Sequence, residues 1–292
     1  MLGIVGGSGF YDVDDPRLGL SDVRRVEVST PFGPPSAPLS VGRIDRPGRA
    51  PLDVVFVPRH GEGHRLLPSE VPYRANVHAL RQLGVTHMLS VSAVGSLREE
   101  IAPGDFVMVD QFIDRTRHRR DTFFGNGVVA HVQFGEPVCP HLHAVVAACA
   151  ESAGIRFHRR GTCVVIEGPT FSTRAESELY RHWGADVVGM TALPEARLAR
   201  EAEIGYALVA MATDYDCWRT DTEEVSVEAV MAVMRSNVSR ARALVGDVAR
   251  ALPETTVDLP VPSSLADAIV TQRDRIDEAA RRRLELLLGP YL

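Results

Sequence analysis

The segment Tyr206-Ala-Leu-Val-Ala-Met-Ala212 decides the fold class, and Thr213-Asp-Tyr-Asp-Cys-Trp218 follows it directly. An apolar run without alternation is typical of a strand that is buried on both faces. In a strand-like backbone Asp214 and Asp216 project to the same side, because side chains alternate with a period of two. The segment therefore predicts two carboxylates at the carboxyl end of a buried strand, where open α/β sheets bind ligands. A solvated strand exit, with one aspartate capping a helix, is the alternative interpretation.

Similar apolar runs recur along the chain, with amphipathic segments between several of them. Strands that alternate with helices indicate a layered α/β sheet. Residues 23–28 and 39–44 are expected to form an antiparallel pair. We therefore predict a single-domain three-layer sandwich, in which a central mixed β-sheet is flanked by helices. The predicted strands are 2–5, 52–57, 87–92, 106–109, 162–166, 185–188 and 206–212, and the predicted helices are 73–83, 142–153, 173–183, 194–202 and 226–252.

The end of the chain is set apart by its composition. Residues 253–264 resemble a linker, and 265–288 show the apolar spacing of an amphipathic helix that could pack on the body or on another subunit. We predict an α/β domain over 1–252, followed by a linker and a C-terminal helical tail over 253–292.

Bulk properties exclude several classes of function. The net charge of −6 with mixed signs argues against a broad nucleic-acid footprint, and no apolar run is long enough to span a membrane. The four cysteines show no CxxC spacing, so a reducing, cytoplasmic location is expected. Metal sites are not predicted. His60 and His64 lie in a segment interrupted by glycines, and the cluster Cys139-Pro-His-Leu-His143 is better explained as a helix start.

Three strand ends carry groups that suit an oxyanion. Gly6-Gly-Ser-Gly9 offers backbone N–H groups and the Ser8 hydroxyl, Pro58-Arg-His60 offers a guanidinium and an imidazole, and Ser92-Ala-Val-Gly-Ser96 offers further hydroxyls and amides. Separately these are a tight turn and a surface Arg-His pair, but together they predict a site for a tetrahedral anion. After two more strands come Phe171, which could stack on a base, and Met190 beside Thr191.

These motifs resemble the 5′-methylthioadenosine phosphorylase branch of the trimeric purine nucleoside phosphorylases. The resemblance is collinear from the N-terminus to about residue 250. It rests on GGSGFY (6–11), TPFG (30–33), RHG (59–61), AVGSLREEIAPGD (93–105), DQFIDRT (110–116), IEGPTFSTRAES (166–177), MT (190–191) and ATDYDCW (212–218).

The resemblance implies a nucleoside phosphorylase fold and phosphorolysis of S-methyl-5′-thioadenosine to adenine and 5-methylthioribose 1-phosphate. Its partners would be a small-molecule nucleoside and inorganic phosphate as co-substrate, with no cofactor and no metal. It also implies a homotrimer or a dimer of trimers. Phosphate would be held by Ser8, Arg59, His60, Ser92, Ala93 and Thr191, whereas Met190 would contact the ribose, Phe171 the base, and Asp214 and Asp216 the adenine.

The chemistry of the leaving group assigns the carboxylates independently. Cleavage of the glycosidic bond places negative charge on the purine, so a donor at N7 accelerates the reaction. We predict that Asp214, held protonated in a low-dielectric pocket, is the general acid, and that Asp216 selects the 6-amino group. Together with His60 in the phosphate set, Asp214 completes the predicted catalytic residues.

Further residues are predicted to set specificity. Val227, Val230 and Met231 would border the 5′ substituent, although their spacing also suits the core stripe of a helix. By the resemblance, His131 would come from a neighbouring subunit. Ser172 is also predicted to contribute to specificity, although it could instead cap a helix. The sequence departs from several relatives at Gly189, where they carry Asn, and has Ser8 and Ser92 where some carry Thr.

Other functions remain open from the sequence. A phosphorylase could act on another 5′-substituted 5′-deoxyadenosine, on methylthioinosine or on purine nucleosides. A hydrolase of the same superfamily would activate water and would have no use for the anion-binding set. A nucleoside-binding module without turnover is the non-enzyme alternative.

Overall fold

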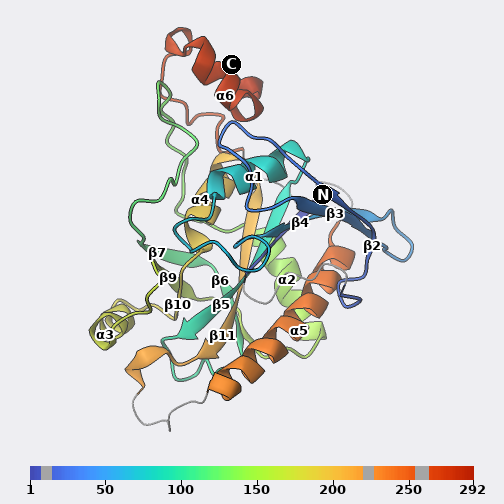
Figure 1. The fold of residues 1–292 in the computed structure, drawn as a ribbon, viewed down its shortest axis with the longest axis vertical. Helices are drawn as coiled ribbons and strands as arrows, with labels where there is room; N and C mark the ends of the chain where they lie inside the picture. Colours follow the sequence, from blue (N-terminus) through green and yellow to red (C-terminus); the bar gives the residue numbers. More distant parts are fainter. Residues whose placement is uncertain (8–14, 220–226, 254–262) are drawn as a thin grey trace.

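Eleven strands in the described part of the chain form one mixed β-sheet at the centre of the molecule (Figure 1). The computed structural model describes residues 1–7, 15–219, 227–253 and 263–292, with side chains in the helix that starts at Val227 described from Met231 onward. Four strands in the middle of the sheet run parallel. They are β4 (Leu52–Pro58), β1 (Leu2–Gly6), β5 (His87–Ser96) and β11 (Gly205–Asp214).

The remaining strands extend this parallel centre in three directions. Beyond β4 lie two antiparallel strands, as predicted. On the other side β10 pairs antiparallel with β5, and two further strands run parallel to β10. A short branch pairs antiparallel with β11. The strands are β2 (Leu20–Val26) and β3 (Leu39–Ile44); β10 (Val187–Gly189), β9 (Thr162–Ile166) and β7 (Gln111–Arg115); and β6 (Phe106–Val109) with β8 (Phe157–His158).

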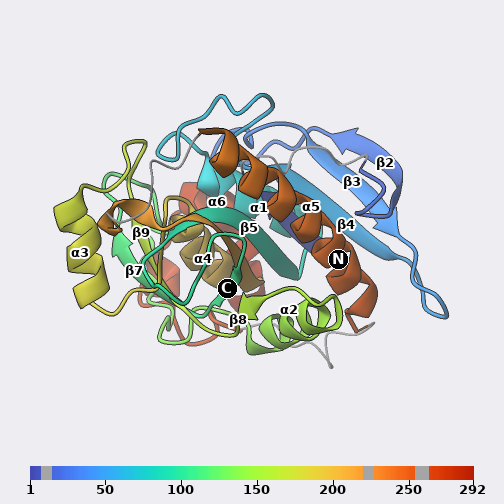
Figure 2. The ribbon, with the colours of Figure 1, turned by 90° about the horizontal axis from the view of Figure 1, so that it is seen from below.

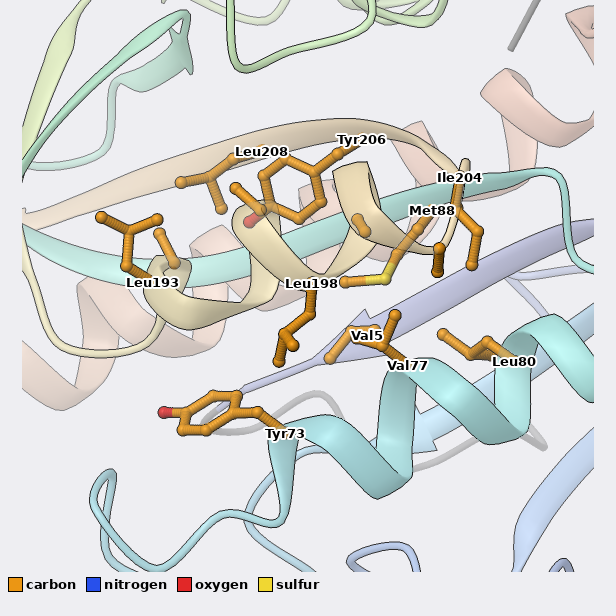
Figure 3. Close-up of a cluster of buried hydrophobic side chains, with 14 of the residues drawn as sticks. Val5, Tyr73, Val77, Leu80, Met88, Leu193, Leu198, Ile204, Tyr206 and Leu208 are labelled. Carbon is orange, nitrogen blue, oxygen red and sulfur yellow. The ribbon is translucent and has the colours of Figure 1, made fainter. Parts of the chain in front are cut away.

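Helices cover both faces of the sheet (Figures 1 and 2). The helices α1 (Tyr73–Gln82) and α4 (Ala192–Glu201) pack on one face, where their apolar side chains meet those of β1 and β5 (Figure 3). The helices α2 (Pro140–Ser152) and α5 (Val227–Ala251) pack on the other. A smaller cluster joins α3 (Arg174–His182) to the outer strands.

Strand β11 shows why the sheet needs two covering layers. Tyr206 and Leu208 belong to the cluster under α1 and α4, whereas Ala207 and Val209 belong to the cluster under α2 and α5. Because successive side chains point to opposite faces, an uninterrupted apolar run can be buried only between two layers. The predicted three-layer sandwich with a mixed sheet is confirmed.

The C-terminal segment differs from the single helix expected over 265–288. Helix α6 covers Glu278–Leu288, and residues before it form turns and a short 3₁₀ segment. The backbone there bonds to other parts of the chain: Ala130 bridges Ile269, and Glu203 accepts from the Leu265 N–H. Leu265 and Ile276 are buried in the core and Ile269 packs against it, although none of the three lies in a helix, so their helix-like spacing does not reflect one.

Within the described residues, no helix combines the length and the apolar character needed to cross a lipid bilayer.

Candidate active site

A cavity of about 420 Å³ opens where the parallel strands end. Its floor is formed by residues that follow β1, β4 and β10 together with the second half of β5, and the end of β11 closes one side. Residues from α5 and from the loop after β9 complete the walls. The predicted site residues that line it are Arg59, His60, Ser92, Ala93, Phe171, Ser172, Met190, Thr191, Asp214, Asp216 and Met231.

Ser92 and Thr191 face each other because β5 and β10 are antiparallel. The ladder pairs Gly95 with Val188, and the same register brings Ser92 opposite Thr191. Their hydroxyl oxygens lie 3.3 Å apart and both residues are buried. The strand register therefore assembles two hydroxyls at one end of the cavity, which we call the anion end. It is defined by Gly7, Arg59, His60, Ser92 and Thr191.

Arg59 is buried at the anion end, with 1% of its surface exposed. Its Nε donates to Glu195 Oε1 at 2.5 Å, and its Nη2 donates to Ser90 Oγ at 2.5 Å and to Glu195 Oε2 at 3.2 Å. Burial lowers the pKa of Arg59, but the Glu195 carboxylate more than offsets this and leaves the pKa raised. The ion pair thus fixes both the charge and the orientation of the guanidinium.

The remaining edge of Arg59 faces the cavity. Nη1 donates to the Val91 carbonyl at 3.2 Å, and its second N–H is left for a ligand. Gly7 makes this approach possible, because a Cβ at that position would lie 2.7 Å from Nη1.

His60 presents a single nitrogen to a ligand. Its Nδ1 lies 2.8 Å from the Leu66 carbonyl oxygen, which can only accept, so Nδ1 carries the proton. Burial, with smaller contributions from Arg59 and from His64, lowers the pKa of His60 to about 4. The His64 ring stacks on it with centroids 4.4 Å apart. At neutral pH the imidazole is uncharged, and Nε2 offers a lone pair.

The aspartates lie at the opposite end of the cavity, which we call the carboxylate end. Asp214 Oδ2 accepts from the Thr213 hydroxyl at 2.7 Å, and its Oδ1 accepts from the Asp216 N–H at 2.8 Å. Gly95 lies beneath the pair, because a Cβ there would be 3.2 Å from Asp214 Oδ1 and from Asp216 Cβ. Both carboxylates therefore belong to the cavity rather than to a solvated strand exit.

Asp216 is the less satisfied carboxylate of the two. Burial raises the pKa of Asp216, and the neighbouring charge of Asp214 raises it further. Its Oδ2 is buried and accepts no hydrogen bond from the described residues. The Ser172 hydroxyl, on another wall, is likewise buried without a partner in this part of the chain. Unpaired buried polar atoms are rare, and because the Ser177 hydroxyl lies close enough to Asp216 to lower its pKa, the Ser172 hydroxyl is the clearer sign of a polar ligand.

Apolar side chains form much of the remaining lining, which also includes His64 and Arg65. Phe171 stands at the mouth with 79% of its surface exposed, and Met190 packs under Gly168, whose Cβ would lie 2.6 Å from the Met190 sulfur. From α5 come Met231, which is 48% exposed, and Met234, one turn later. Thioether side chains are flexible and adapt to irregular apolar ligands.

Four predicted residues do not appear in this cavity. Ser8 lies outside the described residues, and so do the side chains of Val227 and Val230. His131 is described and lies in an exposed loop, where its backbone N–H donates to the Ala268 carbonyl at 2.9 Å. It does not line the cavity of its own chain. Among the described residues no group of His, Cys, Asp and Glu side chains is arranged to hold a metal ion.

Sequence reasoning missed three residues that shape the site. Glu195 follows Pro194 in a helical pattern, and nothing local marks it as the partner of an arginine 136 positions away. Met234 could have been found, since it continues the spacing of Met231 along the helix. Arg119 lies in a charged loop and donates to backbone carbonyls of segments that line the cavity, and no local pattern marks it.

Comparisons with known proteins agree on one family. A family model described as the phosphorylase superfamily matches residues 2–250. A Geobacter sulfurreducens S-methyl-5′-thioadenosine phosphorylase is 50% identical over 293 residues, covering 100% of this chain and 99% of the relative. Its counterpart in Cereibacter sphaeroides is 51% identical, covering 100% and 98%.

Solved structures give the same picture. A methylthioadenosine phosphorylase from an antarctic soil metagenomic library superposes with a TM-score of 0.88 at 42% identity, over 98% of both chains. A methylthioadenosine phosphorylase from Schistosoma mansoni in complex with adenine superposes with a TM-score of 0.76 at 39% identity, over 85% of this chain and 90% of the other.

Proposed function

The chain belongs to the phosphorylase superfamily and, within it, to the S-methyl-5′-thioadenosine phosphorylases, and from this premise we propose that it cleaves S-methyl-5′-thioadenosine with inorganic phosphate. A phosphate oxygen bonds to the anomeric carbon while the bond from that carbon to adenine N9 breaks. The purine takes up one proton from the general acid, the P–O–H proton of monohydrogen phosphate balances it over the whole reaction, and the products are adenine and 5-methylthioribose 1-phosphate. The reaction belongs to purine and methionine salvage.

The observation that carries the proposal is the separation of two chemically different ends within one cavity. Ser92 marks the anion end and Gly95 the carboxylate end, and both belong to β5. Three residues along a strand span about 10 Å, so the two ends of the cavity lie far enough apart for a phosphate and a purine to occupy it together. Phosphate and purine therefore bind together, with the anomeric carbon between them.

At the anion end the residues hold phosphate by hydrogen bonds. Arg59 donates through Nη1, the hydroxyls of Ser92 and Thr191 add donors, and the Ala93 backbone and Ser8 complete the set. His60 Nε2 accepts a hydrogen bond from the P–O–H group of monohydrogen phosphate, because its Nδ1 already donates to the Leu66 carbonyl. This leaves the unprotonated oxygens free to attack.

At the carboxylate end the pair of aspartates recognises adenine. A protonated carboxyl can donate to N7 and accept from the 6-amino group, as the leaving purine requires. Asp214 takes this role and Asp216 adds a second acceptor for the 6-amino group, while Phe171 stacks on the base and Ser172 offers its unpaired hydroxyl. The Thr213 hydroxyl and the Asp216 N–H each donate to one oxygen of Asp214 and hold its carboxyl group in position.

The 5′ substituent meets an apolar wall. Met231 and Met234 line the cavity, with Val227 and Val230 placed earlier on the same helix. Burial of a methylthio group there is favourable, whereas a 5′-hydroxyl would lose its hydrogen bonds to water. His131 completes this wall from a neighbouring subunit, so the active unit is a homotrimer, alone or paired with a second trimer.

The proposal also includes the co-substrate, the lack of a cofactor and the cellular compartment. Inorganic phosphate is a co-substrate, and the residues named supply the chemistry without a cofactor. No disulfide joins any of the four cysteines, which suits the reducing cytoplasm.

Rates with a panel of nucleosides, all with phosphate, test the specificity. We expect kcat/KM for S-methyl-5′-thioadenosine to exceed that for adenosine by roughly 10- to 200-fold, the range available from an apolar contact. A 5′-halogenated adenosine should rank between them, and methylthioinosine last. Equal or higher rates with methylthioinosine would overturn the assignment of the aspartates, and a preference for adenosine would overturn that of the apolar wall.

A further inference from the structure

Arg119 lies behind the cavity and does not line it. It belongs to the loop after β7, and its side chain is 2% exposed. A buried guanidinium needs several acceptors, because taking the charge out of water is expensive unless it is paired and hydrogen-bonded. The acceptors of Arg119 lie in segments that line the cavity or that contact the lining residues.

The guanidinium gathers backbone carbonyls from two of these segments. Nη1 donates to Met190 O at 2.6 Å and to Leu193 O at 2.7 Å. Nη2 donates to Glu167 O at 2.7 Å, and Nε lies 3.2 Å from the Glu167 carboxylate. Thr191, whose hydroxyl faces the anion end, is bracketed by the first two carbonyls. Glu167 begins the loop that carries Phe171 and Ser172.

A third segment joins through Tyr73. Arg119 Nη1 donates to the Tyr73 hydroxyl at 3.3 Å, and that hydroxyl donates to Pro68 O at 2.7 Å. Pro68 lies in the cavity wall that follows His60. A single side chain thus connects three parts of the cavity lining: the segment at Pro68, the segment at Met190 and Thr191, and the loop that carries Phe171 and Ser172.

We propose that Arg119 is a positioning residue for the phosphorolysis described above, which sets the distance between the bound phosphate and the bound nucleoside. The effect on the reaction rests on the proposed function, whereas the hydrogen bonds of Arg119 do not. In-line attack requires the reacting atoms to be held about 3–3.5 Å apart, and a displacement of about 1 Å in one wall lowers the rate by about 100-fold. We call the Arg119 side chain with its bonded carbonyls the clamp. Because it joins the segments that would contact phosphate and the nucleoside, it is suited to hold that distance.

A different buried arginine provides the matched control. Arg46 donates from Nε to Ala50 O at 2.7 Å and from Nη1 to Leu252 O at 2.8 Å, and neither segment reaches the cavity. Arg46→Lys and Arg119→Lys therefore remove the same kind of carbonyl clamp. A lysine keeps the charge but loses the fork that reaches several carbonyls at once.

The test measures KM for phosphate, KM for the nucleoside, and kcat for wild type and the two lysine variants. We expect Arg119→Lys to raise both KM values at least fivefold and to lower kcat by about 10- to 100-fold, whereas Arg46→Lys leaves both KM values within twofold of wild type. Tyr73→Phe removes only the part of the clamp that runs from Arg119 through the Tyr73 hydroxyl to Pro68, and we expect a smaller increase, in the KM for phosphate alone.

Two outcomes would overturn the inference. Arg119→Lys could lower only the active fraction or the midpoint of thermal unfolding, with both KM values unchanged; Arg119 would then be structural. Alternatively, hydrogen exchange could show equal protection of residues 166–168 and 190–193 in wild type and Arg119→Lys. The exchange experiment does not depend on turnover. If Arg119→Lys does not fold, Tyr73→Phe carries the test, and unchanged KM values in it contradict the clamp.

Discussion

Arg59 and Glu195 form an ion pair inside the protein, with Arg59 Nε 2.5 Å from Glu195 Oε1 and both side chains almost fully buried. The Ser90 hydroxyl donates to Glu195 Oε2 at 2.9 Å and closes the network. The anion end thus contains a cation whose charge is already balanced before phosphate arrives. Because His60 is uncharged as well, we expect phosphate to be held by directed hydrogen bonds rather than by excess positive charge.

Replacement of Glu195 by Gln tests this network. We expect the free energy of unfolding to fall by about 3 kcal/mol, because a buried charge loses its partner. The KM for phosphate should rise, because the guanidinium is no longer held in place. Glu62→Gln is the control, since Glu62 pairs with Arg25 on the surface and such pairs contribute little. Wild-type KM for phosphate in Glu195→Gln would contradict the role of the pair.

The pKa of His60 predicts a pH dependence of stability. The folded protein holds this pKa near 4 instead of 6.5, so between those values the unfolded chain binds more protons. Stability contributed by His60 therefore rises with pH across this window and is lost on acidification. His60→Asn keeps a donor for the Leu66 carbonyl but does not titrate. Urea unfolding at pH 5 and pH 7.5 should show a smaller loss in the variant than in wild type; equal losses would contradict the prediction.

The two aspartates should differ when each is changed to asparagine. We expect Asp214→Asn to lower kcat with S-methyl-5′-thioadenosine by about 100- to 10,000-fold, the range for a lost general acid. The amide can donate to N7 and to a 6-oxo group, so activity with methylthioinosine should fall less. Asp216→Asn should mainly raise the KM for the adenine nucleoside. If Asp216→Asn has the larger effect on kcat, the assignment of the acid is wrong.

The apolar wall of α5 should control the 5′ end of the substrate. Met234→Gln places an amide beside the methylthio group, and we expect the ratio of kcat/KM for S-methyl-5′-thioadenosine to that for adenosine to fall by about tenfold. Met234→Leu keeps the apolar surface and serves as the control. An unchanged ratio in Met234→Gln would show that the 5′ carbon lies elsewhere.

Much of this architecture could be predicted from local patterns. The run from Tyr206 to Ala212 is apolar at every position, and such a run fits only between two helical layers. By contrast β7 (Gln111–Arg115) mixes charged and apolar residues, because it lies at the edge of the sheet, and it was not predicted. The residues before α6 have helix-like apolar spacing because turns, rather than a helix, bring their apolar side chains to the core.

The residues of the site also fall into those that could be predicted from the sequence and those that could not. Residues that leave strand ends, such as Arg59 and Asp214, are placed by the sheet itself, so their convergence could be inferred. Glu195 and Arg119 act through partners that are distant in sequence, and only the packing of α4 and of the loop after β7 brings them there. Local sequence carries no trace of such contacts.

The central claim is that phosphate attacks a nucleoside in this cavity, and adenine release measured with and without phosphate tests it most directly. We predict that purified protein releases adenine from S-methyl-5′-thioadenosine only when phosphate is present, with one equivalent of 5-methylthioribose 1-phosphate identified by mass spectrometry. Release at the same rate without phosphate, giving the free sugar, would make the protein a hydrolase and contradict the account. Binding of the nucleoside without any release would make it a binding module.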